Sequence, residues 1–401
     1  MELTVATLIS TGVIATALVM LQSTTRTADT QRELADIQQS LRIAQNEITR
    51  HIRMAGRGGL AGSSASSMHA WRTAAVSVRD HRHQPSELPG IEVETDVLTV
   101  RGVFNSPVYS LSRSEGGATV QLFDGFGAVT EDRTSATSGL LIVENLDLNG
   151  RTQDLAPLID AIEDDLPEAL VMSGGGAPQC TAIVQLDPAS SRVEHEEDRT
   201  TVKIRILLRD GRFTDAYRAL SGAAAQAPCN SASVGILEER HFYVRRIESA
   251  GGVRRALALA RMYPGTGTPY RDRASETRVD LADDISNLQV ALGFVVGGPH
   301  ALQSRDLVVR ETSDGSDDDW LFNGLEDDPD TEPWTRADTS APDLPVIRYV
   351  RFSLWVEGNR RPGRTGSASI AENFRVEQPV PDGSRSAVRF LRSVVAPRST
   401  P

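Results

Sequence analysis

Residues 3–21 read LTVATLISTGVIATALVML, and this stretch decides how the rest of the chain is interpreted. None of its 19 residues is charged, and as a helix they span about 29 Å, close to the hydrocarbon thickness of a bilayer. Its polar members are threonines and a serine, whose hydroxyls can bond back to carbonyls of their own helix. The stretch therefore predicts a helix that crosses a membrane.

The helical signal continues through residues 22–55, which contain neither proline nor glycine. Apolar residues recur there every three or four positions, and this spacing places them along one side of a helix. Charged and amide residues occupy the other sides, so this half is expected to be amphipathic. The apolar positions are Leu34, Ile37, Leu41, Ala44, Ile48, Ile52 and Ala55.

Three glycines between residues 56 and 59 end the pattern, because glycine accepts the left-handed backbone that closes helices. We expect a helical stalk over residues 1–56, with a transmembrane part at 3–21 and an amphipathic part at 22–55. A plain signal anchor followed by a short coiled-coil spacer is the alternative that these residues leave open.

Particular strings in the stalk resemble the N-terminus of type IV pilins, and most closely the PilW-type minor pilins. The strings are Glu2 to Ile9 (ELTVATLI), Thr30 to Leu34 (TQREL) and Ile48 to Gly56 (ITRHIRMAG). The family starts its helix with a glutamate, a leucine and an apolar run. Its minor pilins close the helix with an arginine-rich R-x-A-G turn, which corresponds here to Arg53, Ala55 and Gly56.

Three strings near the C-terminus resemble strands of the same family. They are Asp284 to Gly293 (DISNLQVALG), Ile347 to Glu357 (IRYVRFSLWVE) and Arg389 to Val395 (RFLRSVV). The resemblance therefore covers the stalk well and the last 120 residues in patches, whereas the middle of the chain is interpreted from its residues alone.

The resemblance gives Glu2 and Gly12 roles in subunit assembly within the membrane. In the family the glutamate pairs with the free N-terminal amine of a neighbouring subunit, and an ionised group in the apolar layer costs about 2.5 to 3.5 kcal/mol without a partner. Family members also carry a basic leader and a few mature residues before this glutamate, so we interpret Met1 as an internal start. If Met1 is the true start, Glu2 lies at the water interface instead. Gly12 and its small neighbours would let adjacent helices approach closely.

Strand patterns dominate the rest of the chain. In residues 202–208 apolar and charged side chains alternate, the period of a strand with one buried face. Residues 241–248 and 253–262 flank a Ser-Ala-Gly-Gly turn and predict a hairpin. Only residues 154–170 predict a second helix. Further strands are expected at residues 91–104, 140–148, 181–187, 288–296, 349–356 and 387–395.

We therefore expect an α+β fold, in which the long helix precedes a mainly antiparallel, pilin-like head over residues 57–401. Residues 312–345 are acidic and contain several prolines. Their carboxylates could ligate calcium, but the spacing does not match an EF-hand loop, and acidic runs are usually solvated. We expect a solvated loop and no metal site.

The two cysteines, Cys180 and Cys229, are either separate thiols or a disulfide, and an extracytoplasmic head would favour the disulfide. The net charge of −12 argues against a nucleic-acid partner, which would require a basic face. The glycines at 174–176 lack the Lys-Ser/Thr of a phosphate loop, and residues 195–198 lack the second histidine of a zinc protease. We expect no enzymatic activity and no cofactor.

The resemblance implies a single-pass inner-membrane protein with a periplasmic head that is later incorporated into a type IV pilus. Its expected partners are major and minor pilins, the pilus assembly platform, a tip adhesin, and membrane lipid before assembly. A type II secretion pseudopilin, or a membrane-anchored extracytoplasmic binding protein that never polymerises, remains the alternative.

Overall fold

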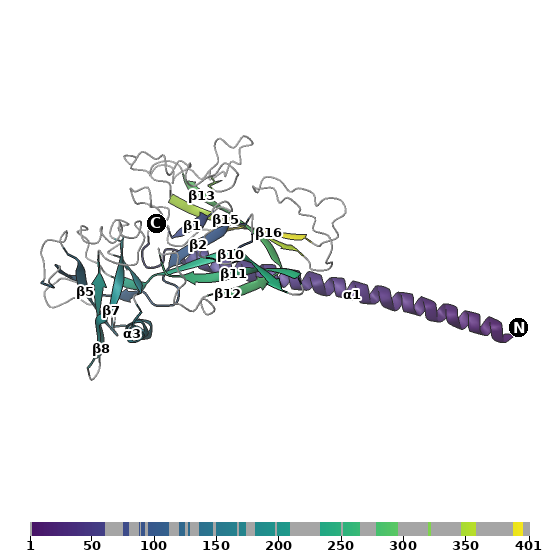
Figure 1. Cartoon of the computed structure of the whole chain (residues 1–401), viewed down its shortest axis with the longest axis horizontal. Coiled ribbons are helices and arrows are strands. Elements are labelled where there is room, and N and C mark those ends of the chain that lie inside the picture. The colour runs from purple at the N-terminus through teal and green to yellow at the C-terminus, as the bar shows by residue number, and fades with distance from the viewer. Residues whose placement is uncertain are drawn as a thin grey trace.

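A computed structural model describes most of the stalk and much of the head. It covers residues 2–60, 75–79, 88, 90–92, 95–111, 120–124, 127–128, 136–146, 150–166, 168–173, 181–196, 199–208, 233–249, 252–264, 278–295, 320–321, 346–357 and 388–395. The side chains of residues 2–9 and of some strand positions lie outside this description. A long helix leads into a head of antiparallel strands, and its first half projects far from that head (Figure 1).

The helices are α1 (Glu2–Met54) and α3 (Ala156–Glu163). The strands are β1 (Val76–Arg79), β2 (Val97–Gly102), β3 (Tyr109–Ser110), β4 (Val120–Phe123), β5 (Ser138–Glu144), β6 (Ala169–Ser173), β7 (Thr181–Glu196), β8 (Arg199–Leu207), β9 (Ser233–Ile236), β10 (Glu238–Ser249), β11 (Gly252–Met262), β12 (Arg278–Asp283), β13 (Ile285–Val295), β14 (Trp320–Leu321), β15 (Val346–Glu357) and β16 (Val388–Val395).

The described strands form three sheets, and two of these enclose the second half of α1. One has the order β1-β2-β10-β11-β12, and the other has the order β14-β13-β15-β16. The chain passes from the first sheet to the second through Asp284, which has a φ of 61° and donates its N–H to the carbonyl of Arg255. Asp96 joins the same two sheets again, because its carboxylate accepts the N–H of Val290 at 2.7 Å.

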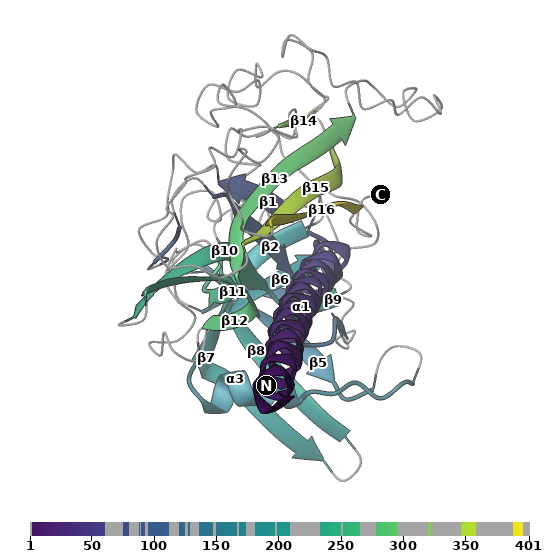
Figure 2. The same cartoon turned by 90° about the vertical axis from the view of Figure 1, so that its right-hand side faces the viewer.

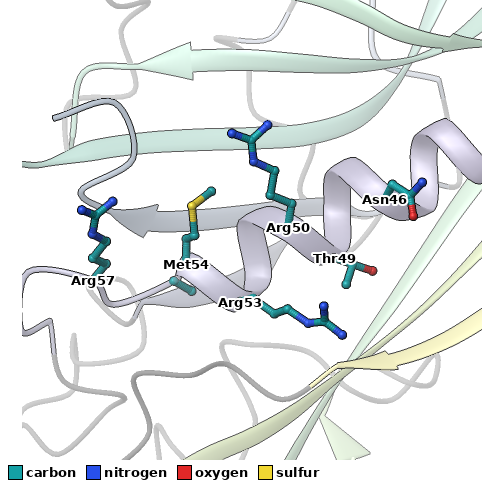
Figure 3. Close-up of a pocket in the computed structure, with 7 residues that line it drawn as sticks. Asn46, Thr49, Arg50, Arg53, Met54 and Arg57 are labelled. Atoms are coloured by element: carbon teal, nitrogen blue, oxygen red, sulfur yellow. The ribbon is translucent and has the colours of Figure 1, made fainter. Parts of the chain in front are cut away.

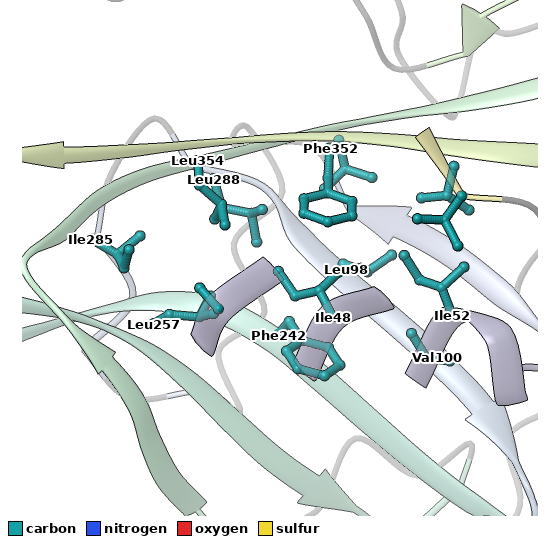
Figure 4. Packing of buried hydrophobic residues seen from close by; sticks show 14 of the residues in the cluster. Ile48, Ile52, Leu98, Val100, Phe242, Leu257, Ile285, Leu288, Phe352 and Leu354 are labelled. Atoms are coloured by element: carbon teal, nitrogen blue, oxygen red, sulfur yellow. The ribbon is translucent and has the colours of Figure 1, made fainter. Parts of the chain in front are cut away.

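The apolar stripe of α1 packs between these two sheets. Ala44, Ile48, Ile52 and Ala55 have no exposed surface. Figure 4 shows Ile48 and Ile52 between side chains of the two sheets, with Phe242 of β10 on one side and Phe352 of β15 on the other. Full burial of one such side chain contributes about 1.5 to 3 kcal/mol. The predicted stripe is therefore confirmed, and its partner is the chain's own head.

The third sheet has the order β3-β9-β6-β7-β8-β5-β4 and forms a separate core with α3, at the end of the head away from the stalk (Figures 1 and 2). Val103, which follows β2, links it to the rest of the head together with Leu60, Val171 and Leu237. A Cβ on Gly235 would lie 2.5 Å from a methyl group of Val103, so only glycine fits there without rearrangement.

The second helix is shorter than its pattern predicts. We expected a helix over residues 154–170, but α3 ends at Glu163 and β6 begins at Ala169. The prediction was wrong in its second half because Pro167 disfavours a helical conformation at the residue before it. Asp165 also adopts a φ of 54°, which ends the helix.

The hairpin prediction is confirmed, because β10 and β11 pair from Glu239 and Met262 up to Ser249 and Gly252. Strands are present within all the other predicted segments, although β2 is shorter and β7 is much longer than expected. The sequence did not indicate β1, β3, β4, β9, β12 or β14. The described part of the chain thus has an α+β fold and a pilin-like layout of one long helix followed by antiparallel sheets.

Candidate assembly surface on the N-terminal helix

The first half of α1 presents apolar side chains on all sides. Every residue from Ser10 to Ala28 is exposed, and none of them packs on the head. Val19, Met20 and Leu21 are 66 to 69% exposed, and contiguous exposed apolar side chains of this size are rare in monomeric soluble proteins. The other large exposed members are Val13, Ile14 and Leu18. This half of the helix is therefore a free apolar surface in the isolated chain.

The threonines of this surface satisfy their hydroxyls within the helix. Thr16 donates to the carbonyl of Gly12 at 2.8 Å, and Thr24 and Thr25 donate in the same way to the carbonyls of Met20 and Leu21. Such bonds leave few unsatisfied polar groups on the helix surface. The helix can therefore contact an apolar neighbour without leaving these hydroxyls unpaired.

Gly12 lies near the start of this surface, where a Cβ would have no atom within 4 Å. The position is open for a neighbour, as the predicted assembly role requires. The backbone of the predicted span at 3–21 is helical, but the side chains of Glu2 and of residues 3–9 lie outside the description. Within the described part of the chain, no helix combines the length and the apolar character needed to cross a membrane.

The helix-closing turn has the predicted residues and a tertiary partner that the sequence did not reveal. Gly56 has a φ of 75°, and its N–H donates to the carbonyl of Arg101 at the end of β2. Ala55 is fully buried, whereas Arg53 points into solvent. A Cβ on Gly102 would lie 3.0 Å from the carbonyl oxygen of Met54, so the turn and β2 lie in close contact.

His51 fixes the last turn of α1 against β10. Its Nδ1 donates to the carbonyl of Glu47 at 2.8 Å. Its Nε2 faces the guanidinium of Arg240, which can only donate, so Nε2 carries no proton and accepts this hydrogen bond. The ring lies between Phe104 and Phe242, with centroid distances of 5.4 and 5.1 Å. This arrangement requires a neutral imidazole, because a protonated one would place two cations in contact.

A buried carboxylate holds Arg240 in place. Glu238 accepts hydrogen bonds from Nε and Nη2 of Arg240, at 3.3 and 2.8 Å, and its exposed fraction is 2%. It also accepts the N–H of Asn105 at 2.9 Å and lies 3.2 Å from Nε of Arg261. Charge-assisted bonds of this kind are stronger than neutral ones. The end of α1 is thus connected to the sheet through a chain of polar contacts.

A second network lies on the opposite face of the same sheet. Glu239 pairs with Arg101 of β2 at 2.7 Å and accepts a hydrogen bond from His241 at 2.8 Å. Thr99 bonds the other nitrogen of His241, and Ser77 accepts from Arg101. Burial alone would raise the pKa of Glu239, but the Arg101 charge and the bonds from His241 outweigh it and hold the pKa well below 4.5.

Little in the sequence indicated these networks. Residues 238–241 read EERH at the start of a strand, but runs of charged residues are more often solvated than buried. The pairing of Glu239 with Arg101 spans 138 positions of sequence, and only the register of β2 with β10 brings the two together. Patterns of residue spacing along the chain do not reveal this register.

A hollow of about 590 Å³ lies beside the exposed side of α1 near the end of the helix. Figure 3 shows its lining residues, among which three arginines are exposed. We call this feature the arginine hollow. The described residues that line it are Asn46, Thr49, Arg50, Arg53, Met54, Ala55 and Arg57.

Other predicted features lie outside the described residues. Cys180 and Cys229 are among them, as is all of the acidic segment 312–345 except Trp320 and Leu321. Among the residues that are described, no group of three histidine, cysteine, aspartate or glutamate side chains is placed to hold a metal ion.

The pH dependence of stability provides a test of the His51 geometry. Burial lowers the pKa of His51 below 6.5, and the Arg240 and Arg50 charges lower it further, whereas Glu47 acts in the opposite direction. The unfolded state then binds the proton more tightly, so the stability that neutral His51 contributes is complete above pH 6.5. It is lost as the pH falls from there toward the folded-state pKa, by about 1.4 kcal/mol per unit of pKa difference.

We expect the wild-type chain in mild detergent to lose stability to urea more steeply than His51→Gln over this range of pH. Glutamine can still accept a hydrogen bond from Arg240 but does not titrate. Equal slopes for the two proteins would show that His51 is not held in the neutral form.

Comparison with known proteins identifies no relative: no family model, no curated protein and no solved structure matches this chain.

Proposed function

We propose that this chain is a minor pilin of the PilW type, a non-enzymatic subunit of a type IV pilus. The proposal places α1 in the inner membrane with the head in the periplasm, followed by incorporation in or near the tip of the fibre. The division of α1 is the observation that carries it: residues 10–28 are exposed and include an apolar run at 12–21 that only Thr16 interrupts, whereas the stripe from Ile37 to Ala55 is buried in the head.

The two halves of α1 suit two different tasks. The buried half, together with the His51 and Arg240 contact, holds the head at a fixed position on the rod. The exposed half is soluble in lipid before assembly, and in the fibre it would pack against the same half of neighbouring subunits. The residues from 2 to 36 extend roughly 52 Å as a helix, long enough for both a membrane span and a spacer.

Close helix packing depends on residues without bulk. The open surface around Gly12 and the internally bonded hydroxyl of Thr16 allow a neighbouring helix to approach. Glu2 would pair with the amine of the next subunit. The partners in this proposal are other major and minor pilins, the inner-membrane assembly platform and a tip adhesin.

The test replaces both assembly residues with bulky apolar ones, as Glu2→Leu together with Gly12→Trp. We expect the wild-type chain to co-purify with pili sheared from the cells, and the double variant to remain in the membrane fraction. The reason is that the tryptophan blocks close approach and the leucine removes the charge pair. Immunoblotting of the sheared and membrane fractions measures both proteins.

Gln38→Trp is the matched control, because it places the same side chain at an exposed position of α1 beyond the apolar half. It should enter pili like the wild type, and all three proteins should share one thermal unfolding midpoint. Normal surface pili that contain the double variant would refute the proposal. A wild-type chain that stays in the membrane under piliating conditions would favour an anchored binding protein.

A further inference from the structure

The arginine hollow carries positive charge that the described part of the chain does not neutralise. Arg50, Arg53 and Arg57 are exposed, and none of them has a carboxylate partner among the described residues. Several arginines of the head are paired with carboxylates, as Arg240 is with Glu238 and Arg254 with Asp283. Like charges one turn apart repel each other, so this cluster is unfavourable without an anion.

The position at the end of a helix explains only part of this charge. A cation in the last turn interacts favourably with the helix dipole, by about 0.3 to 1 kcal/mol. Arg53 gains in this way, because α1 ends at Met54. Arg57 lies beyond the helix, and Asn46 and Thr49 add neutral polar groups to the same hollow. The hollow therefore has the composition of an anion-binding surface.

The opposite charge pattern occurs at the C-terminal end of α3. Asp160, Glu163, Asp164 and Asp165 are all exposed there, and the last turn contains no basic residue. Carboxylates at this end have the wrong sign for the helix dipole. Asp160, Glu163 and Asp165 lack a cationic partner within the part of the chain that is described. We call these four residues the acidic end of α3.

The hollow and the acidic end lie on different parts of the molecule. The hollow lies beside the exposed side of α1, and α3 packs on the seven-stranded sheet at the end of the head away from the stalk (Figure 1). We propose that the acidic end of α3 in one copy of this chain docks into the arginine hollow of a second copy. Guanidinium groups bind carboxylates through paired hydrogen bonds, which would fix the orientation of the two copies.

Such a contact is heterologous, because it joins two different patches. Each copy keeps one unused patch, so copies can add head to tail in an open series. The inference goes beyond the proposed function, since the contact uses only the head and the end of α1. It implies that two copies of this chain can bind each other directly, without a different subunit between them.

Other anions fit less well. If residues 3–21 span a membrane, Arg50 lies 29 residues beyond Leu21, or about 44 Å along a straight helix, too far for lipid headgroups. The net charge of −12 opposes a nucleic acid. A second copy, in contrast, carries the acidic end of α3 as a fixed surface of suitable sign.

The experiment measures the mass of the full chain in mild detergent by light scattering. The arginine variant combines Arg50→Gln, Arg53→Gln and Arg57→Gln, and the acidic variant combines Asp160→Asn, Glu163→Gln and Asp165→Asn. At about 50 mM salt the wild type should form dimers and larger species, which dissociate at about 500 mM because salt screens exposed charges. Each variant alone should be monomeric.

An equimolar mixture of the two variants should form a dimer and nothing larger. In that mixture one copy supplies the intact hollow and the other supplies the intact acidic end, and their remaining patches are disabled. A control with Arg26→Gln, Arg32→Gln and Arg42→Gln changes the charge of the same helix equally, outside the hollow, and should associate like the wild type. All substitutions are at exposed positions, so the unfolding midpoints should agree.

Several outcomes would overturn the contact. They are a wild type that stays monomeric, a mixture of variants that stays monomeric, and association that persists in the arginine variant. Persistent association at high salt would indicate packing through the apolar half of α1 instead. Binding of inorganic phosphate or anionic vesicles without self-association would replace the second copy with those ligands. None of these results depends on whether the chain enters pili.

Discussion

Replacing Ile48 with aspartate is expected to release α1 from the head. Ile48 has no exposed surface and lies between the two sheets that enclose the helix. Truncation of such a side chain to alanine already costs about 2 to 5 kcal/mol, and a buried carboxylate adds a desolvation cost of several more. Because typical domains are stable by about 5 to 15 kcal/mol, the variant should lose cooperative unfolding of the helix with the sheets.

Ile43→Asp is the matched control, because it introduces the same group five positions earlier on the same helix. Ile43 is 40% exposed, so its substitution should change stability by less than about 1 kcal/mol. Thermal unfolding in detergent, together with protease sensitivity of the region after Met54, measures both variants. Equal midpoints for Ile48→Asp and the wild type would contradict the docking of the stripe.

The second large effect is expected from Glu239→Ala. The substitution leaves the guanidinium of Arg101, which is 5% exposed, without its carboxylate. Removing one partner of a buried pair typically costs about 3 to 5 kcal/mol, because the remaining charge stays buried and unpaired. His241 would lose its hydrogen-bond acceptor as well. Urea unfolding of the full chain measures the loss.

The control for this prediction is Glu194→Ala, which breaks the pair of Glu194 with Lys203 at the same nitrogen to oxygen distance of 2.7 Å. Both of its side chains are about 40% exposed, and exposed pairs contribute about 0 to 1 kcal/mol. A double variant, Glu239→Ala with Arg101→Met, should recover part of the loss because it removes both charges. Similar losses for Glu239→Ala and Glu194→Ala would argue against the buried network.

The Glu239 carboxylate also makes the stability of the fold depend on pH in the acid range. Its pKa in the folded chain lies below the usual 4.5, so the unfolded state binds the proton first as the pH falls. The stability that Glu239 contributes is complete above pH 4.5 and is lost below it. The range differs from that of His51, whose contribution falls below pH 6.5. Two separate declines are therefore expected during acid titration.

The features predicted well from the sequence depend on residues close together in the chain. The stripe from Leu34 to Ala55 follows from helical spacing, and the β10 and β11 hairpin follows from alternation around a glycine turn. Gly56 could be placed at the end of α1 because its positive φ favours glycine over other residues. Where a short apolar run fits either structure, as at Ala169 and Leu170, the helical spacing predicted the end of a helix, but these two residues begin β6 instead.

The amino-acid sequence by itself determined that a long helix with one apolar half and one striped half precedes a β-rich head, because periodicity is a local property. Only the tertiary structure decided that the stripe packs inside its own head and that His51 meets Arg240. It also showed that Arg50, Arg53 and Arg57 surround a hollow. These contacts depend on strand order and register, which join residues more than 100 positions apart and leave no periodic signal in the chain.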